Sequence, residues 1–124
     1  MKHNNKRPRF LSLWQIRLPI AGFVSILHRV SGVFLLLLLP FLLYLLQLSL
    51  SSAEGFTQSQ DIMESWPVRI LGLLLLWMFI HHLFAGIRVL LIDLEWGSEL
   101  IAARRSAWLV MIAALLVVIG GTML

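Results

Sequence analysis

The sequence contains no cysteine. Disulfides, thiolate zinc sites, cysteine nucleophiles and cysteine-ligated iron–sulfur clusters are therefore excluded. Charge is also scarce, because 13% of the 124 residues are charged while 60% are hydrophobic, whereas soluble domains carry about 25% charged residues. A soluble fold this apolar could not cover its surface with polar side chains. The length allows a single domain, residues 1–124, and the composition favours a lipid bilayer as its solvent.

Three long stretches lack any charged residue. They cover residues 30–53, 70–87 and 106–124, which are 24, 18 and 19 residues long. A membrane-spanning helix needs about 20 mostly apolar residues. The sequence therefore predicts an all-α integral membrane protein with three transmembrane helices, at about residues 19–48, 67–91 and 106–123. The polar segments 51–66 and 93–105 are expected to be loops, the first with room for a surface helical turn.

Residues 1–18 are expected to form a basic tail followed by an interfacial segment. Residues 1–9 are polar and basic, and Trp14 and Arg17 are residue types that settle in the headgroup layer. No small-residue cleavage site precedes a short apolar run, so a secretory signal is not expected. An organelle-targeting leader rich in Arg and Ser is also missing. A bacterial plasma membrane is the simpler location, and no nucleic-acid partner is expected.

Lysine and arginine are distributed unevenly between the predicted loops. Four of them lie within residues 1–9, and the second loop contains Arg104 and Arg105. The first loop has none between Arg29 and Arg69. Because basic loops stay cytoplasmic, we expect the N-terminus and the second loop to be cytoplasmic and the C-terminus to be external.

Five ionisable side chains fall inside the predicted spans. Such groups are costly in a bilayer and are candidates for function. No Asp or Glu lies in any span, which disfavours a carboxylate-driven proton antiporter. At about 1.5 Å per residue, all five lie in the middle or the cytoplasmic half of two antiparallel helices, which indicates one site. They are His28, Arg29, His81, His82 and Arg88.

The surroundings of His82 allow two interpretations. Ala85 and Gly86 follow it by three and four residues, so all three share a helix face. Small neighbours would leave room for a flat macrocycle bound to His82, but they also permit close helix packing. His82 could equally donate a hydrogen bond to another helix or act in a proton relay. The sequence alone leaves these alternatives open.

The other four groups also have more than one interpretation. Ser25 and Arg29 are four residues apart on one face of the first helix, and His28 lies beside them. Arg29 and Arg88 could instead extend to the cytoplasmic interface. His81 points about 100° away from His82, which favours a packed or lumen-facing neutral group.

Two spaced motifs carry a family resemblance. They are SILHRVSG, from Ser25 to Gly32, preceded by RP at Arg7–Pro8, and HxxxGIRxLLxD, from His82 to Asp93. Together with the three-helix layout and the two loop lengths, they resemble the cytochrome b556 membrane-anchor subunits of succinate dehydrogenase. The resemblance covers essentially the whole chain. It is the spaced combination that is specific, because neither motif alone would be.

The resemblance implies an anchor subunit that contains no catalytic residue for succinate. A second three-helix anchor would complete the helical bundle, share a b-type haem and help to dock a flavoprotein and an iron–sulfur protein. His82 would be one axial ligand of the haem iron, and the partner anchor would supply the other. Ser25 and Arg29 would line the ubiquinone site, and His28 would approach the haem propionates. Many relatives have His directly after GIR, where this chain has Val89, which places more weight on His82.

The residue types agree with this implied chemistry. Neutral imidazole is a good iron ligand. A hydroxyl and a fixed cation in a low-dielectric site stabilise negative charge developing on a quinone oxygen, although Arg29 could also neutralise a haem propionate. The chain would then be no enzyme alone, but a subunit that passes electrons from succinate oxidation to ubiquinone. The alternatives are the anchor of a fumarate reductase and a small non-redox transport or assembly protein.

Overall fold

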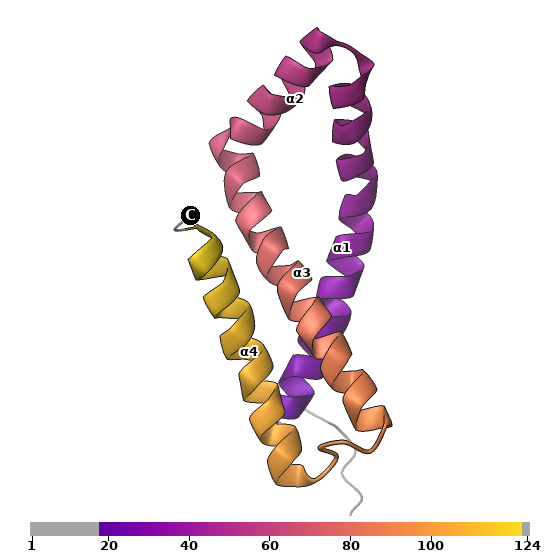
Figure 1. Cartoon of the computed structure of the whole chain (residues 1–124), viewed down its shortest axis with the longest axis vertical. Helices are drawn as coiled ribbons and strands as arrows, with labels where there is room; N and C mark the ends of the chain where they lie inside the picture. Colours follow the sequence, from indigo (N-terminus) through magenta and orange to yellow (C-terminus); the bar gives the residue numbers. More distant parts are fainter. Residues whose placement is uncertain (1–17, 123–124) are drawn as a thin grey trace, which may run out of the picture.

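The computed structural model describes residues 18–122, which form four helices and, within that range, no strand. In chain order the helices are α1 (Ile20–Ser51), α2 (Ala53–Glu64), α3 (Trp66–Asp93) and α4 (Leu100–Thr122). The helices α1, α3 and α4 are long and apolar enough to cross a membrane, and Figure 1 shows how they are arranged. The prediction of an all-α membrane protein with three spans is confirmed. The predicted tail and interfacial segment lie almost entirely outside the described residues.

The first connection differs from the expected loop. Residues 53–64 form α2, a 12-residue helix that joins α1 to α3 at the end of the molecule far from Ile20 (Figure 1). Its start is capped, because the Gly55 amide donates to Ser52 Oγ at 2.9 Å. The negative charge of Glu54 in the first turn also interacts favourably with the positive end of the helix dipole. These local signals outweigh the polar composition that had indicated a loop.

The helix α4 begins earlier than predicted. It starts at Leu100 and includes Arg104 and Arg105, which the sequence had placed in the second loop. The preceding helix α3 ends in a Schellman-type turn, in which the Trp96 amide bonds to the Leu91 carbonyl at 2.9 Å. The left-handed residue of this turn is Glu95, with a φ of +64°, whereas Gly97, which was predicted to break the helix, lies beyond the turn with a φ of +73°.

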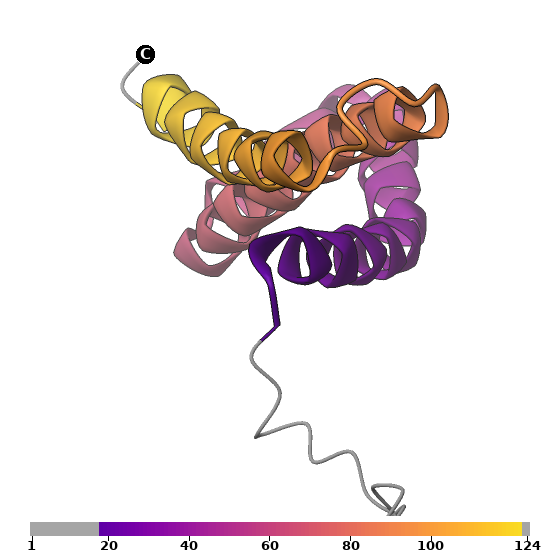
Figure 2. The ribbon, with the colours of Figure 1, turned by 90° about the horizontal axis from the view of Figure 1, so that it is seen from below.

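Small side chains bring the three long helices together near the N-terminal end of α1. The buried apolar core consists of Val24 from α1, Ala85 from α3, and Ala107 and Val110 from α4. Alanine lets helix backbones approach closely in a membrane, where helix association depends on packing. Seen from this end, α3 and α4 lie side by side and α1 packs against α3 (Figure 2). Ala85 is 1% exposed, which supports the packing interpretation for this residue.

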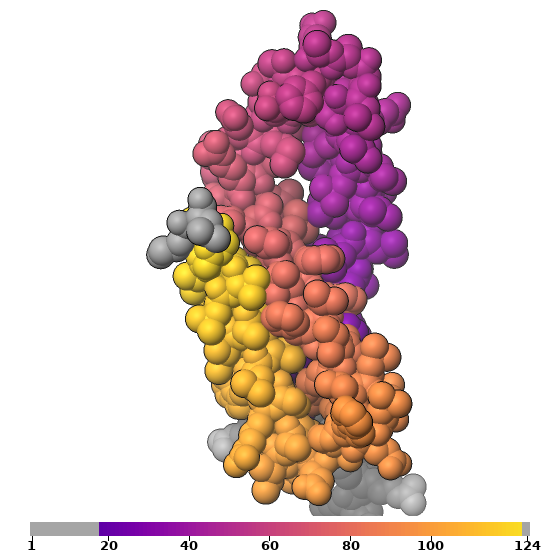
Figure 3. Space-filling view, viewed as in Figure 1, coloured from indigo at the N-terminus to yellow at the C-terminus, as the bar shows by residue number. Residues whose placement is uncertain are grey.

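Most of the remaining surface is apolar. Leu36 and Leu37 on α1 are each 69% exposed and Leu116 on α4 is 62% exposed. A continuous surface of this kind suits lipid or other membrane helices. Towards α2 the helices α1 and α3 diverge, and a hollow opens between them (Figure 3).

Candidate functional site

His82 lies on the face of α3 that contacts α1. Its Nδ1 atom is 3.0 Å from the His28 carbonyl oxygen and 3.2 Å from Ser31 Oγ. The Ser31 hydroxyl in turn donates to the same His28 carbonyl at 2.9 Å. The backbone of α1 and one buried serine therefore hold the imidazole of His82 in a single orientation.

These contacts define the tautomer of His82. A carbonyl oxygen only accepts hydrogen bonds, so Nδ1 must carry the proton that it receives. The lone pair of the neutral ring is then on Nε2, which has no hydrogen-bond partner among residues 18–122. Metal-ligating histidines are commonly oriented by such a bond from the opposite ring nitrogen. The Nε2 atom of His82 is thus the ring nitrogen that can donate a lone pair.

His28 stacks on His82 across the α1–α3 interface. The ring centroids are 4.2 Å apart and the rings are inclined by 23°. His28 Nε2 lies 3.5 Å from the position that a Cβ would take at Gly86. The small residue Gly86 was predicted to leave room for a flat macrocycle. The structure places the His28 ring next to this position. The predicted proximity of His28 and His82 is confirmed, while their roles stay predictions.

Ser31 and Gly32 take part in the site although they were not singled out as site residues. Ser31 is 3% exposed and bonds as described above. A Cβ at Gly32 would lie 2.9 Å from His82 Cε1, closer than ordinary contacts allow. The available signal was their position directly after His28 and Arg29 in the first motif.

Replacing Gly32 by alanine is expected to destabilise the protein by about 1–3 kcal/mol, because overpacking a close contact has that cost. The added methyl group would displace the His82 ring and weaken its bond to the His28 carbonyl. The matched control is Gly72→Ala in α3, where a Cβ meets no atom within 4 Å. That variant should gain about 0.5–1 kcal/mol of helix propensity. Detergent-induced unfolding of the purified protein measures both, and equal effects would contradict the proposed contact.

His81 occupies the interior of the chain. It is 0% exposed, and neither ring nitrogen has a hydrogen-bond partner among residues 18–122. Its ring lies 5.5 Å from that of Trp77. His81 shares a helix face with Ala85 and Arg88, so its side chain is enclosed within this chain. Of the two expectations for His81, the structure supports the packed neutral group.

Arg88 is a buried side chain of α3 that bonds to the neighbouring helix. It is 9% exposed, and its Nε donates to Ser106 Oγ at 3.0 Å. Its Nη2 donates to the Ala103 carbonyl at 3.0 Å. Arg88 therefore links α3 to α4, which a sequence pattern could not show because both partners come from another helix.

Ser25 and Arg29 lie on α1 close to His28 in sequence, but the structure separates their environments. Ser25 is half-buried, whereas Arg29 is exposed. Arg29 borders a hollow of about 300 Å³ together with Val30, Val33 and Phe34. Ser25 is not among the residues that line this hollow. The structure brings His28, Ser31 and His82 together and leaves Arg29 on the outer surface of α1.

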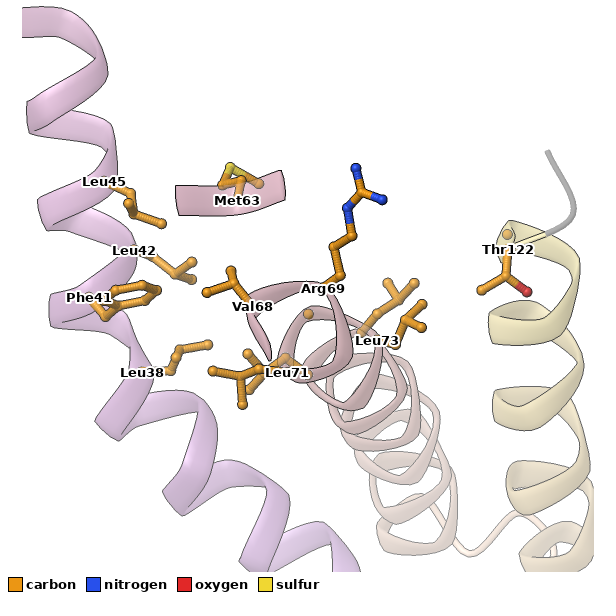
Figure 4. Close-up of a pocket in the computed structure, with 14 residues that line it drawn as sticks. Leu38, Phe41, Leu42, Leu45, Met63, Val68, Arg69, Leu71, Leu73 and Thr122 are labelled. Carbon is orange, nitrogen blue, oxygen red and sulfur yellow. The ribbon is translucent and has the colours of Figure 1, made fainter. Parts of the chain in front are cut away.

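The larger groove lies elsewhere, at the α2 end of the molecule. It has a volume of about 550 Å³ and lies between α1 and α3 (Figure 4). Leucines and a phenylalanine from α1 face Val68 and Leu71 of α3, and Arg69 is the single charged residue in its lining. The lining of the groove contains neither histidine nor serine and is mostly apolar.

The described residues contain no group of three or more His, Cys, Asp or Glu side chains that could hold a metal ion. A haem iron, in contrast to a zinc ion, takes only one or two axial ligands from protein. The geometry at the α1–α3 interface therefore offers one oriented imidazole nitrogen.

Comparison with known proteins shows the family to which the chain is similar. A family model described as the succinate dehydrogenase/fumarate reductase transmembrane subunit matches residues 3–121. The cytochrome b556 subunit of succinate dehydrogenase from Coxiella burnetii is 33% identical over 118 residues, covering 94% of each chain. The protein of the same name from Paracoccus denitrificans is 29% identical over 105 residues, covering 85% of this chain and 81% of the relative.

Proposed function

Because this chain belongs to the succinate dehydrogenase/fumarate reductase transmembrane subunit family, we propose that it anchors a succinate:quinone oxidoreductase in the membrane and binds a b-type haem. The observation that carries the proposal is the orientation of His82. Its Nδ1–H bonds to the His28 carbonyl at 3.0 Å, so that Nε2 is the nitrogen with the lone pair.

The residues around His82 fit a haem ligand. The Ser31 hydroxyl and the His28 carbonyl hold the ring, and His28 is close enough to reach the edge of a group bound at His82. His81 is enclosed within this chain and could not share a ligand with a partner subunit. When bound, a b-type haem supplies one-electron chemistry within the bilayer. One oriented histidine also implies a second axial ligand from the partner anchor.

We assign the quinone-binding role to Ser25 and Arg29. They are four residues apart and thus share one face of α1. Arg29 is exposed beside a hollow of about 300 Å³, where its guanidinium can donate to a quinone oxygen. The Ser25 hydroxyl would donate a second hydrogen bond. Both donors would stabilise negative charge on the quinone oxygen during ubiquinone reduction. Succinate itself would be oxidised on the flavoprotein subunit, with electrons arriving through the iron–sulfur subunit.

We further propose that the N-terminus and the α3–α4 connection are cytoplasmic in a bacterial inner membrane. Three spans then place the C-terminus outside, in agreement with the lysine and arginine distribution. A reporter that is active only in the periplasm should be inactive when it is fused after Gly97 and active when it is fused at the C-terminus. The reverse pattern would contradict this orientation.

The test of the function is purification of the tagged chain from native membranes, followed by a reduced-minus-oxidised visible spectrum and identification of the proteins that accompany it. We expect a b-type haem band together with a flavoprotein, an iron–sulfur protein and a second small anchor. A colourless preparation without these partners would instead support a non-redox membrane protein. Whether the complex works as a fumarate reductase depends on the direction of turnover measured with the purified complex.

A further inference from the structure

Arg88 is a buried cation whose described contacts are all with neutral groups. The residue is 9% exposed, and its guanidinium bonds to the Ser106 hydroxyl and the Ala103 carbonyl. The nearest acidic residues along the chain, Asp93 and Glu95, are exposed and are not among its partners. Neutral acceptors satisfy hydrogen bonds but do not balance a buried charge, which is strongly unfavourable without a counter-ion. An anion from outside residues 18–122 is therefore expected near Arg88.

A cavity of about 230 Å³ has Arg88 among its lining residues. Arg88 and Ser106 supply its polar wall, and Trp96 and Gly97 from the α3–α4 connection border it at the end of the span. Phe84, Leu109 and Val110 are among the apolar residues that complete it. The two hydrogen bonds of Arg88 hold its guanidinium in place, and Nη1 has no partner among the described residues. The cavity thus combines a fixed, available cation with an apolar wall.

The position of the cavity indicates which kind of anion can enter it. It is lined by residues of α3, of α4 and of the connection between them, which lies at one end of the molecule (Figure 1). Tryptophan, here Trp96, is typical of the membrane–water interface. Ile87 and Leu109 in its lining are 47% and 66% exposed, so apolar surface surrounds its opening. Arg104 and Arg105 follow at the start of α4 and are exposed, which adds positive potential at the same level.

We propose that this cavity binds the phosphate of an anionic phospholipid. A phosphate oxygen accepts a hydrogen bond from Arg88 Nη1, while the Ser106 hydroxyl donates to the Ala103 carbonyl at 3.1 Å and helps to hold the guanidinium in place. The acyl chains lie along the exposed apolar surface of α3 and α4. Guanidinium groups recognise phosphate through charge-assisted hydrogen bonds. The neighbouring arginines favour a headgroup with net negative charge. This site is separate from the haem and quinone proposals, because Arg88 bonds to α4 whereas His82 faces α1.

The proposal can be tested with the complete membrane protein, purified with its native partners in mild detergent. Native mass spectrometry after delipidation measures the phospholipid that stays bound. Titration with phosphatidylglycerol, phosphatidylcholine or inorganic phosphate then measures recovery of thermal stability. The variants are Arg88→Gln, which removes the charge, and Leu109→Trp, which fills the cavity but retains Arg88. Arg69→Gln makes the same charge change at the other end of α3 and is the matched control.

We expect one phosphatidylglycerol to stay bound in the unmodified protein and in Arg69→Gln. Both test variants should bind it at least about tenfold more weakly, since the loss of a hydrogen bond to a charged group has that effect. The filled-cavity variant keeps the α3–α4 hydrogen bonds, so its loss of lipid cannot be attributed to failed folding. Equal protection by phosphatidylcholine or by inorganic phosphate would overturn the proposal. Unchanged lipid binding in Leu109→Trp would also overturn it. The same holds if cross-linking from position 109 captures a carboxylate of a partner protein in place of lipid.

Discussion

Replacing His82 by leucine is expected to abolish the low-spin b-type haem spectrum of the purified complex. The Nδ1–H of His82 bonds to the His28 carbonyl, so its Nε2 lone pair is available to coordinate iron. Leucine cannot ligate iron, so the partner's single ligand would leave the haem high-spin or unbound. The measurement is the reduced-minus-oxidised spectrum together with haem content per complex.

The adjacent residue provides a matched control for this experiment. His81→Leu removes an imidazole from the same helix, but His81 is 0% exposed and makes no hydrogen bond within the described chain. Its replacement by an apolar side chain of similar size should leave the haem spectrum intact, and relieving two unsatisfied nitrogens should not reduce stability. An unchanged bis-histidine spectrum in His82→Leu would reject the assignment and direct attention to His28 or His81.

Replacing Ser25 by alanine should lower quinone reduction by roughly 30–150-fold, which corresponds to the loss of about 2–3 kcal/mol of transition-state stabilisation. Arg29→Gln should have an effect of the same order. It is also expected to lower the haem potential if Arg29 lies near a propionate, because a nearby positive charge favours reduced iron. Steady-state assays with a soluble ubiquinone analogue measure the rate, and a redox titration measures the potential.

The control for this pair separates the quinone site from the rest of the complex. Succinate oxidation by an artificial acceptor at the flavin and the haem content should both be unchanged. Ser49→Ala removes a hydroxyl from the same helix, where it bonds only to the Leu46 carbonyl at 2.8 Å, and should leave quinone reduction intact. If both Ser25→Ala and Arg29→Gln kept full activity, the quinone site would have to lie elsewhere on the complex.

Part of the candidate site could be anticipated from the sequence. His28 and His82 were expected at similar depth on two helices, and their rings are 4.2 Å apart. This succeeded because depth depends only on position along a helix and on its direction through the membrane. The segment 51–66 was less successful, because a Ser52 cap produces a helix where polar composition indicated a loop.

The sequence by itself determined the three membrane spans, the presence of a connection between the second and the third, and the few ionisable groups inside the spans. These properties depend on hydrophobicity and length relative to the bilayer, which are local. Only the tertiary structure decided between neighbouring candidates. It enclosed His81 within the chain, bonded Arg88 to α4 and directed His82 towards Ser31 and Gly32. The physical reason is that helix contacts depend on where and at what angle helices cross, and in a uniformly apolar chain no pattern along the sequence specifies that crossing.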